Sequence, residues 1–165
     1  MAAAADFDQA RMLAVRGSIA EAVTALDAVL AEEPGHLQAL LLKAGLLLGA
    51  REEEEALALY RRGVAAAPRS AEALNGLARC LHAQGFDGEA LGVAETARSL
   101  LGEGDNFRHV APVYLTVVWC LREQRRFREA LAAAEDGLSR CPDAILAQWA
   151  SLVEEELAEA EKEEC

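Results

Sequence analysis

The residues of this sequence that could perform chemistry are its cysteines, its histidines and one short glycine-rich segment. The cysteines are Cys80, Cys120, Cys141 and Cys165. They contain no CxxC pair, and no cysteine and histidine stand at the spacing that is typical of a zinc site. We therefore expect reduced thiols and no bound metal, with Cys80 and Cys120 acting as small core residues.

The histidines and the glycine-rich segment do not indicate catalysis either. None of His36, His82 and His109 belongs to an HExxH motif, and a nucleophilic Cys–His pair would require proximity in the folded chain. The segment Gly102-x-Gly104 could cradle a phosphate, but no Lys-Ser/Thr follows it, which favours a plain connection. We predict no enzymatic activity and no cofactor.

Composition and charge narrow the class of protein. The chain has 165 residues, is rich in alanine and leucine, and contains only four prolines, a composition that favours an all-helical domain. Its net charge of −12 argues against binding to nucleic acid or to an anionic membrane. The N-terminal MAAAADFDQA lacks a positively charged region, and no segment reaches membrane-spanning length. We therefore expect a soluble cytoplasmic protein.

A repeat organises most of the sequence. The tripeptide Glu-Ala-Val/Leu recurs with its alanine at 22, 56, 90 and 130. The first two steps are 34 residues long and the third is 40, and Pro34 and Pro68 keep the same 34-residue step. A fixed period of this length is typical of a helical solenoid.

The repeated residues resemble those of the tetratricopeptide repeat family, in which each repeat is a pair of helices. The third repeat carries the first-helix pattern as Leu74, Leu77, Ala78 and Leu81. The second repeat carries Leu40, Ala44, Leu47, Ala56, Tyr60 and Pro68. Lys43 departs from the pattern where leucine is usual, and Val118 stands where a small residue normally allows close approach of helices.

This resemblance implies an all-α, right-handed α-solenoid of four helix-turn-helix units followed by a capping helix. The expected repeats are 3–36, 37–70, 71–110 with a six-residue insertion, and 111–144, and the capping helix and acidic tail are 145–165. Within them we predict helices at about 4–16, 19–32, 38–50, 53–66, 71–84, 87–101, 108–124, 127–140 and 143–160.

Three local features carry further expectations. Ser18 followed by Glu21 predicts a capping box at the start of the second helix. The six extra residues fall near Leu100–His109 and are expected to form a loop. The glutamates after Glu154 oppose the dipole of the last helix, so we expect its last turns to fray into a solvating tail.

In tetratricopeptide repeat proteins the first helix of each pair lines a concave groove that commonly binds extended or helical peptides. The resemblance places the following residues in that groove: Phe7, Arg11, Leu41, Gly45, Leu48, Asn75, Arg79, His82, Leu115, Trp119, Arg122 and Trp149. The N-terminal part of this set is apolar and the C-terminal part is polar and basic, which fits a partner with an apolar anchor and a carboxylate. Alternatively, Arg79 and Arg122 pair with neighbouring glutamates such as Glu72 or Glu123.

These observations predict a non-enzymatic adaptor that binds a protein or peptide partner. The clamp that holds the terminal carboxylate of heat-shock chaperones needs Lys and Asn at set places, and these are absent here. One alternative is a bacterial secretion-type chaperone that holds an apolar segment of an export substrate, although such proteins usually have a helical extension before three repeats. Another is a self-assembling scaffold in which the tail helix of one copy fills the groove of another, so a homo-oligomer is possible.

Overall fold

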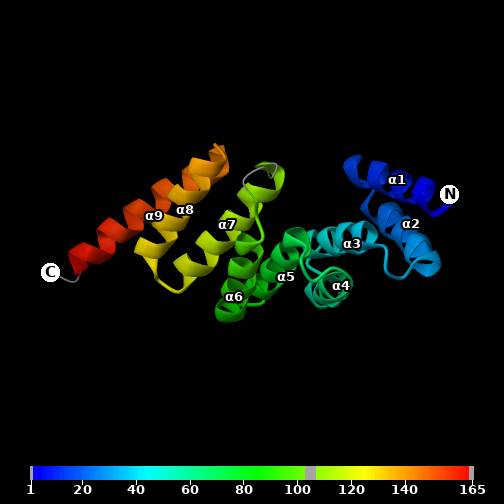
Figure 1. Cartoon of the computed structure of the whole chain (residues 1–165), viewed down its shortest axis with the longest axis horizontal. Helices are drawn as coiled ribbons and strands as arrows, with labels where there is room; N and C mark the ends of the chain where they lie inside the picture. The colour runs from blue at the N-terminus through cyan, green and yellow to red at the C-terminus, as the bar shows by residue number, and fades with distance from the viewer. Residues whose placement is uncertain (1, 103–106, 164–165) are drawn as a thin grey trace. The chain divides into compact units, whose positions relative to one another are not determined.

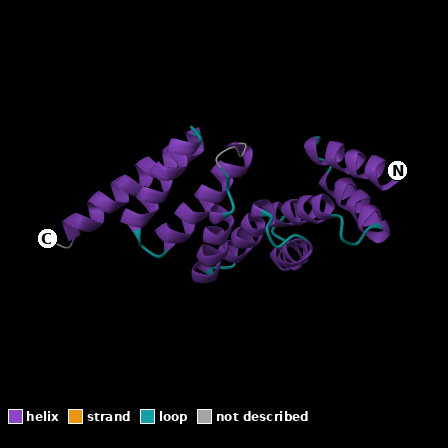
Figure 2. Ribbon diagram, in the orientation of Figure 1, coloured by secondary structure: helices purple, strands orange, loops and turns teal. Residues whose placement is uncertain are grey.

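The computed structural model describes residues 2–102 and 107–163 and divides the chain into two compact units, Met1–Pro68 and Arg69–Cys165. Within the described residues the chain consists of nine helices joined by short turns and contains no strand (Figure 2). The fold is therefore an all-α helical repeat. The helix boundaries agree with the predicted ones to within about three residues, as expected for boundaries set by turns.

The first unit contains two helix pairs, labelled in Figure 1. They are α1 (Ala2–Val15), α2 (Ile19–Glu32), α3 (Leu37–Gly49) and α4 (Glu53–Ala66). Helix α1 packs on α2 and α3 packs on α4, while α2 and α3 join the two pairs. Ala10, Leu26, Val29 and Ala39 form a buried apolar cluster where the two pairs meet.

The second unit contains two further pairs and a last helix (Figure 1). They are α5 (Ala71–Ala83), α6 (Asp87–Ser99), α7 (Phe107–Glu123), α8 (Phe127–Arg140) and α9 (Ala144–Glu163). The first helices of successive pairs are neighbours, because α7 packs against both α5 and α9. A single apolar core that includes Tyr114, Val117 and Leu146 holds this unit together.

The turn inside each helix pair contains one residue in the left-handed region. Gly17 and Gly85 have φ of 81° and 80°, and Arg51 and Arg125 have φ of 68° and 57°. These four positions follow one another at the same 34, 34 and 40 residue steps as the repeat. Glycine adopts this conformation without strain, whereas the Cβ of arginine is crowded there, so two of the four turns are locally strained.

The capping box predicted at Ser18 is wrong, although α2 does begin at the next residue. The Ser18 side chain makes no capping hydrogen bond, and its ψ of 65° lies outside the extended region that an N-cap residue normally adopts. Side-chain caps occur instead at the turns between pairs. The backbone N–H groups of Ala39, Ala73 and Leu146 donate to His36, Ser70 and Asp143, respectively.

The structure explains why lysine is tolerated at position 43, where the family usually has leucine. Its ammonium group donates to Asp27 Oδ1 at 2.8 Å and to Glu55 Oε1 at 2.9 Å, from the helices on either side of α3. The Lys43 side chain is only 10% exposed, whereas both carboxylates are more than half exposed. The chain therefore buries the aliphatic stem and keeps the charges near water.

Part of the six-residue insertion is helical. Helix α7 has 17 residues, compared with 13 in α3 and α5, so part of the extra sequence adds a helical turn ahead of Pro112. Gly104, Asp105 and Asn106 of the predicted loop lie outside the described residues. On the N-terminal side of the loop, Arg140 donates to the carbonyl oxygen of Gly102 at 2.7 Å.

Helix α9 covers the end of the second unit through Leu146 and Val153, which are fully buried. Ile145 and Leu152 of the same helix are exposed. The helix continues to Glu163, three residues beyond its predicted end. Arginines at the end of α7 and start of α8 compensate its acidic side chains, as in the 2.8 Å pair of Arg128 and Glu161.

In the described part of the chain, no helix combines the length and the apolar character that are needed to cross a membrane.

Candidate functional site

Four of the predicted groove residues in the second unit form one continuous set of contacts. His82 of α5 stacks against Trp119 of α7, with ring centroids 6.1 Å apart and planes 21° apart. Trp119 meets Trp149 of α9 edge-on at 5.9 Å. The Arg122 guanidinium lies 5.6 Å from the centroid of the Trp149 ring. We call these four residues the aromatic strip, because they connect three helices through their rings.

Arg122 is already engaged by carboxylates of the same chain. Its Nε donates to Glu156 Oε2 at 2.8 Å, and its NH1 donates to Glu123 Oε1 at 3.0 Å. The hydrogen bond to Glu156 raises the pKa of Arg122 above its ordinary value. The alternative in which Arg122 pairs with Glu123 is therefore what the structure shows. The prediction that Arg122 is free to bind a partner carboxylate is therefore corrected.

Glu156 was missed in the sequence, although the repeat contains the signal that locates it. It lies 34 residues after Arg122 and therefore at the same place in the next repeat. Trp149 likewise follows Leu115 by 34 residues, and Trp149 was included in the predicted set. Extending the 34-residue period by one more repeat, into α9, would have placed the Glu156 carboxylate beside Arg122.

Two buried polar atoms of the second unit, one of them in this strip, have no hydrogen-bond partner among the described residues. They are the indole Nε1 of Trp119 and the side-chain Oδ1 of Asn75 on α5. Unpaired buried donors and acceptors are uncommon and costly, and each calls for an explanation. Arg79, on the same helix as Asn75, is exposed and makes no ion pair with any described residue, while Leu115 is buried.

The predicted groove residues of the first unit differ from one another in exposure and in contacts. Leu41 is only 6% exposed, so it offers almost no surface to a ligand, contrary to the prediction of an open apolar groove residue. Phe7 is half-buried against His36, with ring centroids 5.0 Å apart. Arg11 pairs with Asp8 at 3.0 Å on the surface. The remaining two residues are Gly45, which is exposed, and Leu48, which is half-buried.

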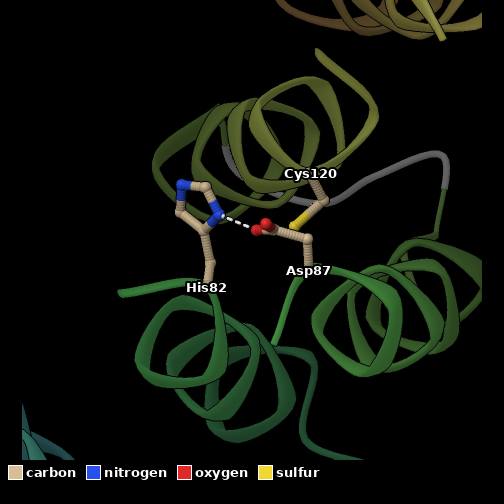
Figure 3. A group of neighbouring side chains, drawn as sticks. All are labelled: His82, Asp87 and Cys120. Atoms are coloured by element: carbon tan, nitrogen blue, oxygen red, sulfur yellow. Dashed lines mark hydrogen bonds and ion pairs between the residues drawn. The ribbon is translucent and has the colours of Figure 1, made fainter. Parts of the chain in front are cut away.

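A second group of side chains in the second unit was not foreseen. His82 Nδ1 lies 2.6 Å from Asp87 Oδ1, and the Cys120 thiol faces the same carboxylate (Figure 3). One potential ligand atom from each of the three residues lies within 4.8 Å of the other two. Burial, and then the charge of Asp87, raises the pKa of Cys120 to about 12. The three residues come from α5, α6 and α7, so no local spacing could have revealed them.

Within each unit the first helices of successive pairs are neighbours, and the turns inside the pairs repeat one conformation, which defines a helical-repeat protein of the class that mediates protein–protein interaction. The model of the family described as Tetratricopeptide repeat matches residues 7–71 and 54–105. Because these matches cover more than half of the sequence, the chain belongs to the tetratricopeptide repeat family.

Solved structures agree on the fold. The crystal structure of the MamA protein has a TM-score of 0.75 at 19% identity and covers 94% of this chain and 82% of its own. The structure of pilF from Pseudomonas aeruginosa has a TM-score of 0.81 at 19% identity, covering 96% and 70%. YrrB, described as a TPR protein with an unusual peptide-binding site, has a TM-score of 0.67 at 15% identity, covering 90% and 74%. Among curated proteins, none has significant sequence similarity to this chain.

Proposed function

We propose that this chain is a non-enzymatic adaptor that binds a peptide or helix of a partner protein across α5, α7 and α9. The observation that carries the proposal is the aromatic strip, since residues that the family resemblance assigned to one groove are in contact in the folded unit. The tetratricopeptide repeat fold supports an interaction role, and the peptide-binding site described for YrrB is a structural precedent.

The residues of the aromatic strip indicate which chemical groups the partner carries. Trp119 and Trp149 are half-buried, so each leaves ring surface for an apolar side chain, and aromatic residues of this kind dominate binding energy at interfaces. Arg122 is occupied by Glu156, which leaves exposed Arg79 as the cation for a partner carboxylate.

The proposal is tested by selecting peptides from a random phage library against the full chain and measuring their affinities by fluorescence anisotropy. A substitution that removes an aromatic anchor typically costs about 2 kcal/mol, so Trp149→Ala should weaken selected peptides about thirtyfold. Trp149→Phe, which keeps a ring, should weaken them much less. Arg79→Ala should selectively weaken peptides that carry a carboxylate.

The control is Phe86→Ala, which removes an aromatic side chain that is 56% exposed in the turn after α5. Selected peptides should bind this variant within twofold of wild type. Peptides that bind the Trp149→Ala protein as tightly as wild type, with its circular dichroism unchanged, would refute the proposed site. Enrichment of apolar segments from export substrates, or of the α9 sequence itself, would instead support the chaperone or the self-assembling scaffold.

A further inference from the structure

Three side chains of different ligand chemistry converge where α5, α6 and α7 meet. His82 comes from the last turn of α5, Asp87 is the first residue of α6, and Cys120 lies on the buried face of α7. In Figure 3 the imidazole and the sulfur approach the Asp87 carboxylate from two sides. Imidazole, carboxylate and thiol are the donor groups from which protein zinc sites are built.

The group is held in place by its neighbours. Trp119 stacks on the His82 ring, and Gln124 Nε2 donates to the backbone carbonyl oxygen of Asp87 at 3.1 Å. Contacts of this kind fix the orientation of metal ligands in known sites. An ion can reach the group from solvent, because the side chains of His82 and Asp87 are each 25% exposed while Cys120 lies behind them.

We propose that His82, Asp87 and Cys120 form a Zn²⁺ site, with Nδ1, a carboxylate oxygen and the thiolate as the three protein ligands. Three protein ligands leave the fourth position of a tetrahedral ion to water. Two anionic ligands balance the charge of the ion. This mixture of nitrogen, oxygen and sulfur donors selects a borderline-soft metal over Mg²⁺ or Ca²⁺.

Binding requires one change of spacing and two changes of protonation. The Nδ1 and Oδ1 atoms, now 2.6 Å apart, separate to about 3.3 Å, the spacing of two ligands each about 2.0 Å from a tetrahedral ion. The Cys120 thiol releases its proton to solvent, and the imidazole proton resides on Nε2 so that Nδ1 can donate its lone pair. The negative charges of Asp87 and Glu123, which oppose a bare thiolate at Cys120, favour a cation at the same place.

The experiment is a Co²⁺ titration of the full chain followed by optical absorption, since cobalt adopts zinc geometry and its thiolate complexes absorb in the near ultraviolet. We expect one Co²⁺ per chain, a thiolate charge-transfer band, and loss of that band when Zn²⁺ is added. Cys120→Ser should abolish the band. Asp87→Asn and His82→Gln, at partly exposed positions, should weaken Co²⁺ binding at least tenfold without changing the circular dichroism.

The matched controls are Cys80→Ser, Cys141→Ser and Cys165→Ser, which remove the other thiols one at a time and should each keep the band. Zn²⁺ should also raise the melting temperature of the wild type and leave that of Cys120→Ser unchanged. Absence of a band at millimolar Co²⁺, or a band that survives Cys120→Ser, overturns the proposal. So does an Asp87→Asn protein that is folded and binds Co²⁺ as tightly as wild type.

Discussion

Helix α8 packs closely on its neighbours at Gly137, and this makes the cost of one added methyl group predictable. A Cβ atom built at Gly137 would lie 2.7 Å from Leu146 Cδ2 of α9 and 2.7 Å from Tyr114 Cγ of α7. Both side chains are almost fully buried, so neither can swing into solvent. Helix α8 can therefore approach its two neighbours only because this position has no side chain.

The magnitude follows from two opposing effects. Alanine is a better helix former than glycine by about 0.8–1.0 kcal/mol. Overpacking a rigid core typically costs about 1–3 kcal/mol, and contacts this short on two buried neighbours place Gly137→Ala near the upper end. The net loss of unfolding free energy is expected to be about 1–2 kcal/mol.

Gly92→Ala is the matched control, because Gly92 lies in helix α6 and a Cβ there would meet nothing within 4 Å. The same substitution should stabilise the protein by about 0.5–1 kcal/mol at this position. The two tryptophans of the chain, Trp119 and Trp149, both lie in the second unit, so urea unfolding followed by their emission reports on the unit that carries both substitutions. If Gly137→Ala is as stable as wild type, the packing of α8 against α7 and α9 described here is incorrect.

Four further predictions concern stability and reactivity. Lys43→Leu should leave the unfolding free energy unchanged or raise it by about 1–2 kcal/mol, because its half-exposed carboxylate partners remain hydrated. Lys43→Ala should lower the unfolding free energy by about 2–3 kcal/mol. A large loss of unfolding free energy for Lys43→Leu in urea titrations would contradict this reasoning. Arg51→Gly should raise the unfolding free energy by about 0.5–1 kcal/mol by relieving the left-handed backbone, and Gly85→Ala, with a φ of 80°, should lower it. Because burial raises the pKa of Cys120 to about 12, iodoacetamide at pH 8 should label it in metal-free protein only after unfolding, as peptide mapping would show. Since the unfolded thiol loses its proton first, Cys120 should also lower the free energy of unfolding as pH rises from about 9 towards 12; rapid labelling of the native protein would contradict its burial.

The helices could be predicted from the sequence because local residues determine their ends. Helix α4 has the predicted bounds, since the acidic run before Ala56 and Pro68 after it delimit one repeat. Residue types alone could not show that Ser18 lacks a capping hydrogen bond. The failure of the predicted capping box depends on a backbone conformation set by the left-handed Gly17, and a residue-type motif does not encode that angle.

The site was less predictable because its contacts join distant parts of the chain. The family resemblance assigned Trp119 and Arg122 to one groove, but the pairing of Arg122 with Glu156 depends on how α9 packs against α7. The same holds for His82 and Cys120, which share a carboxylate only because three helices meet there. Periodicity therefore predicts which residues share a face, whereas charge pairing and ligand geometry require the packed helices.

The adaptor account is tested most directly by the side-chain resonances of the two tryptophans. A ¹H–¹⁵N correlation spectrum of the labelled full chain contains two indole N–H signals, from Trp119 and Trp149. We predict that a peptide selected from the random library shifts both signals, because both tryptophans are half-buried and leave ring surface for the peptide. A saturating peptide that leaves both indole signals in place while shifting amide signals elsewhere would contradict the account.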